Sequence, residues 1–138
     1  METINHEYYV SLEVAKLLKE AGFDWEEHYP RNFCYVNDNT ELFDKSVLKN
    51  YTEEDDVIYL APTLDIAQRW LREVKNIDVV VLRAMQWIQF YYTIEHEENR
   101  TSKVDFMSLN EDLWWFKYEE AQEVGIKKAL KLILEKGK

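Results

Sequence analysis

The sequence IDVVVL at residues 77–82, followed by WIQFYYTIE at 87–95, predicts two neighbouring β-strands. Side chains alternate between the faces of a strand, so a strand with one face in water alternates apolar and polar residues. Neither stretch does so. The first ends in four consecutive apolar residues. In the second, every other residue from Ile88 to Ile94 points to one face, while Trp87 and Tyr91 point to the other. Both faces of the predicted sheet therefore need to be covered.

Either of two structures could cover the second face of this predicted sheet. One is the irregular region at 24–59 or the first predicted helix, and the other is a second subunit or a partner protein. A large aromatic side chain buries about 150–250 Å², so several of them together exceed the few hundred Å² that a monomer usually exposes. Tyrosine and tryptophan suit interfaces because they combine apolar area with a polar tip. The candidate partner-binding residues are Trp87, Tyr91 and Trp114.

Three helices are predicted around these strands, at 12–21, 64–75 and 118–135. Ser11 and Thr63 are placed to cap the first two helices, and Gly22 is placed to end the first one. The last helix carries glutamates before lysines, an order that compensates the helix dipole. Apolar residues recur at helical spacing in all three, so each helix has a face to bury.

The remaining pattern predicts further strands at 33–36 and 102–107, with a hairpin loop at 96–100. The stretch 112–116 is predicted to be either a fourth strand or an extended approach to the last helix. We expect one α+β domain over residues 1–138. Its three- to four-stranded, mainly antiparallel sheet should carry the second and last helices on one face, with the first helix at an edge or on the other face.

The composition of the chain argues against a nucleic-acid-binding protein and against a membrane protein. The 138 residues hold 17 basic and 27 acidic side chains, a formal net charge of −10, which argues against direct binding to nucleic acid. Cys34 is the single cysteine, no secretory signal opens the chain, and no stretch has the ~18 apolar residues of a membrane span. We therefore expect a cytoplasmic protein that does not enter membranes.

Two segments bring carboxylates beside an imidazole, at 26–28 and at 95–98, where Glu95, His96, Glu97 and Glu98 follow one another. Both are predicted to lie in loops, and neither has the histidine spacing of a helical zinc site, so we predict solvated loop charges and no metal or cofactor. Cys34 lies in a predicted strand, which indicates a buried, inert thiol. With no phosphate-binding loop either, no catalytic residue is predicted.

Three segments of the chain, taken together and in order, resemble a known group of proteins. They are SLEVAKLLKEAGF at 11–23, YLAPTLDIAQRWLRE at 59–73 and YEEAQEVGIKKAL at 118–130. In this order they resemble small phage- and prophage-associated proteins of gut Bacteroidetes bacteria. The resemblance does not extend to 24–58 or 85–95. It implies an intracellular, phage-related origin and brings no catalytic residues.

We expect a non-enzymatic protein-interaction module that either self-associates, as in a homodimer, or binds a host protein. Two alternatives stay open. The first is an acidic inhibitor that presents carboxylates in place of phosphates at a host protein's nucleic-acid site. The second is a small enzyme that uses a carboxylate–histidine pair in a loop.

Overall fold

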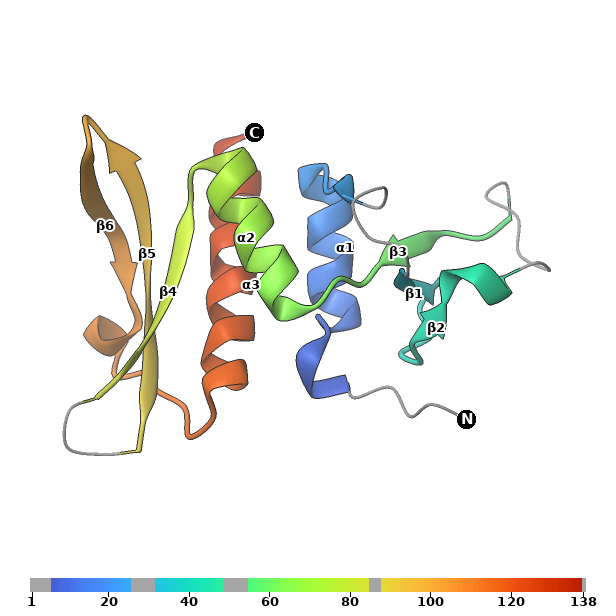
Figure 1. The fold of residues 1–138 in the computed structure, drawn as a ribbon, viewed down its shortest axis with the longest axis horizontal. Coiled ribbons are helices and arrows are strands. Elements are labelled where there is room, and N and C mark those ends of the chain that lie inside the picture. Colours follow the sequence, from blue (N-terminus) through green and yellow to red (C-terminus); the bar gives the residue numbers. More distant parts are fainter. Residues whose placement is uncertain (1–5, 26–31, 49–54, 85–87, 138) are drawn as a thin grey trace.

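The computed structural model describes residues 6–25, 32–48, 55–84 and 88–137. Within these ranges the protein has an α+β fold with three α-helices and two three-stranded antiparallel sheets, as the sequence predicts in its class. Figure 1 shows the layers from one side to the other: a large sheet, the pair α2 and α3, then α1, and a small sheet beyond it. The helices thus lie between the two sheets.

The large sheet has the order β4-β5-β6, with β4 at Asp78–Arg83, β5 at Phe90–Glu98 and β6 at Thr101–Met107. Val79 pairs with Ile94 and Val81 with Tyr92, so these four side chains share one face. Val79, Tyr92 and Ile94 are fully buried there. Between Ile94 and Glu95 the register with β6 shifts by one residue, which leaves Asp105 as the extra residue of a β-bulge.

The helices are α1 at Leu12–Ala21, α2 at Leu64–Lys75 and α3 at Tyr118–Lys136. The predicted caps are confirmed: the hydroxyls of Ser11 and Thr63 accept from the third backbone N–H beyond them. Gly22 ends α1 with φ of 95°, a left-handed conformation that suits glycine. Among the described helices, none has the length and apolar content that crossing a membrane requires.

The small sheet has the order β2-β1-β3, with β1 at Phe33–Val36, β2 at Phe43–Asp44 and β3 at Ile58–Leu60. The first helix packs between this sheet and α3, so it contacts α3 and β3 (Figure 1). Cys34 is fully buried in β1, as predicted. The described parts of 24–59, together with α1, therefore lie on the opposite side of α3 from the large sheet, and the expectation that they cover its second face is wrong.

The helical layer reaches the large sheet through a close approach at Gly125. A Cβ on this residue would lie 2.6 Å from Val79 Cγ1 and 3.0 Å from Tyr92 Cγ, so only glycine lets α3 come this near. A partly buried chain of polar side chains adds to this contact. The Gln122 side-chain amide donates to Asp65 and Gln68 of α2, and Gln68 donates in turn to the Val79 carbonyl. These contacts fix which face of the sheet the helices cover.

Two predicted details differ in the structure, and the structure decides one alternative that the sequence left open. Strand β5 begins only at Phe90, so Ile88 precedes it and is 66% exposed rather than part of the inward row. The hairpin loop is shorter than 96–100, because β5 continues to Glu98 and a two-residue turn follows. Asn99 and Arg100 have φ of 52° and 65°, which matches the twist of the flanking strands. The stretch 112–116 is not a fourth strand, and only Trp115 makes a β-bridge, to Phe90.

Candidate functional site

The face of the large sheet that points away from the helices is the candidate site, here called the outer face. Gly125 of α3 meets Val79 and Tyr92, so the helices cover the face of those two residues. Alternation then places Leu82, Tyr91 and Glu95 on the opposite face. Figure 1 shows all three α-helices on one side of this sheet.

An apolar row crosses the outer face near the start of β5. Leu82 of β4 lies directly opposite Tyr91 of β5. On the other side of β5, Phe90 and Trp115 exchange backbone hydrogen bonds of 2.7 and 2.8 Å. The Trp115 ring points inward, with its centroid 5.6 Å from that of Tyr92. Its neighbour Trp114 therefore points outward, next to Tyr91, and completes a row of Leu82, Tyr91 and Trp114.

This row is accessible to solvent. Leu82 is 37% exposed, Trp114 39% and Phe116 68%, while Tyr91 is partly buried between its neighbours. Trp114 and Phe116 touch edge to face, with ring centroids 4.9 Å apart. A short helix at Ser108–Glu111 follows β6 in the described ranges. This helix does not cover Leu82, Trp114 or Phe116, which stay exposed. These adjacent aromatics form an exposed apolar patch, and the largest apolar patch of a protein is often functional.

The structure brings together two of the three candidate partner-binding residues, Tyr91 and Trp114. Trp87 lies outside the described residues. The sequence reasoning missed Leu82 and Phe116 as members of the same patch. The position of Phe116 could have been predicted from the sequence. It lies two residues after Trp114, and in an extended chain such residues share one face.

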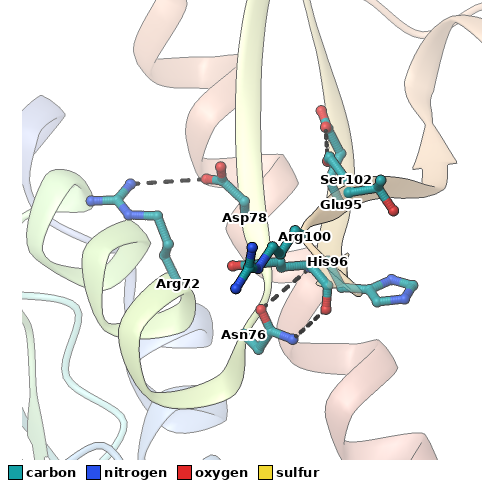
Figure 2. A pocket seen from close by; sticks show the side chains of 9 residues that line it. Arg72, Asn76, Asp78, Glu95, His96, Arg100 and Ser102 are labelled. Carbon is teal, nitrogen blue, oxygen red and sulfur yellow. Dashed lines mark hydrogen bonds and ion pairs between the residues drawn. The ribbon is translucent and has the colours of Figure 1, made fainter.

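The other end of the outer face is polar and contains a pocket of about 350 Å³ (Figure 2). It lies where the junction between α2 and β4 meets the β5–β6 hairpin. Asn76 holds that junction in place: its amide donates to the Glu97 carbonyl at 3.0 Å, and its side-chain oxygen accepts from Glu97 N–H at 3.3 Å. The following residues line the pocket: Arg72, Asn76, Asp78, Glu95, His96, Glu97, Arg100, Thr101 and Ser102.

The Glu95 carboxylate has a defined orientation in this pocket. One oxygen accepts from the Thr93 hydroxyl at 2.5 Å and the other from the Ser102 hydroxyl at 2.6 Å. Both donors are neutral, so they orient the carboxylate without cancelling its charge. Asp78, directly opposite Glu95, is 3.9 Å from the Arg72 guanidinium. The pocket thus presents oriented negative charge on the same face as the apolar row.

His96 belongs to the other face of the hairpin. Its Nδ1 lies 2.7 Å from Asp105 and its Nε2 lies 3.2 Å from Glu98, and both carboxylates raise the pKa of the imidazole. The segment 95–98 is therefore strand and not loop, and alternation turns the His96 ring away from Glu95. The acidic pair 26–27 and His28 lie outside the described residues.

Both ring nitrogens of His96 are engaged by carboxylates, so the geometry is that of a structural ion pair. The part of the chain that the structure describes contains no cluster of three or more histidine, cysteine or acidic side chains arranged to hold a metal ion.

The chain was compared with known proteins, and no protein family, curated protein or solved structure matches it.

Proposed function

We propose that this chain is a protein-interaction module that binds a partner protein through the outer face of its large sheet. The observation that supports this function is the exposed row of Leu82, Tyr91 and Trp114. Side chains of this type at the centre of a surface patch are those that carry most of the binding free energy in protein interfaces.

The area of the row is adequate for a specific contact. With Phe116 included, the exposed apolar area is on the order of 300 Å², judged from aromatic side chains of about 150–250 Å² each. At about 25 cal/mol per Å², its burial contributes roughly 7 kcal/mol before the costs of association. An ordinary interface of ~800 Å² per partner would add a polar rim of roughly 500 Å² around this centre.

Charge favours a different protein over a second copy of this chain. The net charge of −10 repels another copy, and the outer face carries Glu95 and Glu97 beyond the apolar row. In a symmetric dimer the same patch meets itself. A two-fold axis along β5 would set Glu95 of one copy against Glu95 of the other.

The resemblance to phage and prophage proteins, which stays a prediction, implies that this partner is a protein of the bacterial host. The two alternative functions gain less support from the geometry. An acidic mimic of nucleic acid needs carboxylates at the centre of its contact surface, whereas the centre of the outer face is apolar. A carboxylate–histidine enzyme needs an imidazole nitrogen that can exchange a proton with substrate, whereas both nitrogens of His96 have carboxylate partners.

Two measurements test the proposal. Sedimentation velocity of the purified chain at micromolar concentration should show a monomer, and a stable dimer that Trp114→Ser dissociates would assign the face to self-association instead. A partner captured from native cells, then purified, should bind the wild type directly and lose at least tenfold in affinity with Tyr91→Ser or Trp114→Ser.

Matched variants keep the test specific. Val57 is 43% exposed beside β3 of the small sheet and Val74 is 49% exposed on α2. Neither residue belongs to the large sheet, so Val57→Ser and Val74→Ser should leave binding unchanged. Phe116→Ser changes the most exposed member of the patch and serves if Tyr91→Ser unfolds the protein. Equal binding by wild type, Trp114→Ser and Phe116→Ser would refute the proposed function.

A further inference from the structure

We infer that the partner presents an arginine or lysine side chain to the pocket at the polar end of the outer face, beside the apolar row. This inference rests on the proposed function and specifies the chemistry of the partner. It depends on three observations: the pocket, the oriented carboxylates in it, and their fixed distance from Tyr91.

The pocket and the row lie on the same face of the sheet, with the buried Thr93 between them. Tyr91, Thr93, Glu95 and Glu97 alternate along β5 onto the same face, and the hydrogen bonds from Thr93 and Ser102 to Glu95 confirm that these three side chains share it. A segment that lies along β5 over the row therefore reaches the pocket without changing direction. At about 350 Å³ the pocket has room for one long side chain.

The charges in the pocket favour a cation. Three carboxylates line it, those of Asp78, Glu95 and Glu97. Arg72 approaches Asp78, at 3.9 Å, whereas no lysine, arginine or histidine of the described ranges lies within 4.0 Å of the Glu95 or Glu97 carboxylate.

The other cation at the pocket is Arg100, an exposed residue of the two-residue turn. Three acidic residues and two arginines thus line the pocket, while the ring of His96, which also lines it, is paired with Asp105 and Glu98. The chain's net charge of −10 attracts cationic partners over a longer range. Arginine suits the site best, because its planar guanidinium donates two parallel hydrogen bonds to a carboxylate.

The register gives the spacing that the partner must have. Glu95 follows Tyr91 by four residues of β5, which at about 3.4 Å per residue is roughly 14 Å. The apolar residue that contacts the row and the cation that enters the pocket should be the same distance apart. This is about four residues in an extended segment and about nine in a helix.

The experiment uses the full-length chain and a random linear peptide library as the probe. Peptides selected on the wild type should combine an aromatic or large aliphatic residue with an arginine or lysine at one of those two spacings. Resynthesis with citrulline in place of arginine keeps the shape and removes the charge, and should weaken binding at least tenfold.

The matched variants are Glu95→Gln/Glu97→Gln and Glu98→Gln. The double variant should weaken the arginine peptide at least tenfold and bind the arginine and citrulline peptides equally. Glu98→Gln removes a charge from the same hairpin but from its other face, so it should behave as the wild type. Circular dichroism and unfolding curves show that each variant is folded.

The outcomes separate this inference from the proposed function. Selected peptides that need Trp114 but bind as well with citrulline would overturn the cation pocket and leave the docking face intact. Failure to select any peptide whose binding depends on Trp114 would overturn both. A Glu98→Gln variant as weak as the double variant would show a general charge effect and also count against the pocket.

Discussion

Gly125 of α3 lies so close to Val79 of β4 that a Cβ atom on residue 125 would come within 2.6 Å of Val79 Cγ1. This contact joins the helical layer to the inner face of the large sheet. It also leaves the outer face, with Tyr91 and Trp114, uncovered by the three α-helices.

Replacing Gly125 by alanine should destabilise the protein although alanine is the better helix former. Helix propensity favours alanine by about 1 kcal/mol, but overpacking against Val79 and Tyr92 costs about 1–3 kcal/mol. We expect a net loss of about 1–2 kcal/mol in urea unfolding. Gly137→Ala is the control, because the atoms nearest to a Cβ there are 3.7 Å away. An increase in stability for Gly125→Ala would contradict the close approach.

The two adjacent tryptophans should respond differently to substitution. Trp115 packs on Tyr92 in the core, so Trp115→Ser should lower the free energy of unfolding by about 2–4 kcal/mol. Trp114 is 39% exposed on the outer face, so Trp114→Ser should cost less than about 1 kcal/mol. Urea denaturation followed by circular dichroism measures both. Equal losses would place Trp114 in the core and remove the basis of the docking face.

His96 should make the hairpin more stable at acidic pH. Hydrogen bonds to Asp105 and then Glu98 raise the pKa of the imidazole above its ordinary 6.5. The stabilisation from the imidazolium is complete below about pH 6.5 and is lost as pH rises through the raised pKa. NMR titration of the ring should show a pKa above 6.5, and the unfolding midpoint should decrease as the pH rises above about 6.5.

The control for this titration is Asp105→Asn, which removes the larger of the two causes. In this variant the pKa of His96 should move back toward 6.5, and the change in stability with pH should diminish. Added salt should also reduce it, because the histidine is at the surface. An unchanged pKa in Asp105→Asn would show that the hydrogen bond at the β-bulge does not form in solution.

Tyr35 should stabilise the junction between the small sheet and the N-terminal segment. Its hydroxyl donates to the Val10 carbonyl at 2.6 Å in a buried position, and burial raises the pKa of Tyr35 to about 12. Tyr35→Phe leaves this carbonyl without its donor and should cost about 1–2 kcal/mol in urea unfolding. Tyr8→Phe, at an exposed tyrosine, should change stability by less than about 0.5 kcal/mol.

The helices were predictable because their signals are local. Ser11 and Gly22 set both ends of α1 within a few residues of sequence, and the structure has the same bounds. The hairpin was harder to predict. A run of charged residues at 95–98 is typical of a loop, but pairing with β6 keeps this run in a strand up to Glu98.

The candidate site was predictable in part. Tyr91 and Trp114 were expected on a second face from alternation alone, which requires only that the chain be extended. The pocket could not be predicted, because its walls come from the α2–β4 junction as well as the hairpin. The contact from Asn76 to Glu97 that joins them spans 21 residues.

Periodicity and capping in the sequence are sufficient for the α+β class, for the helix bounds, and for the conclusion that both faces of the large sheet carry large apolar side chains. They act between residues that are near neighbours in the chain. The identity of the covered face depends on contacts between distant residues, above all α3 meeting β4 and β5 at Gly125. Alternation treats both faces of a strand alike, so only the packing of α3 and α2 shows which face is covered and that the helices leave the face of Tyr91 open.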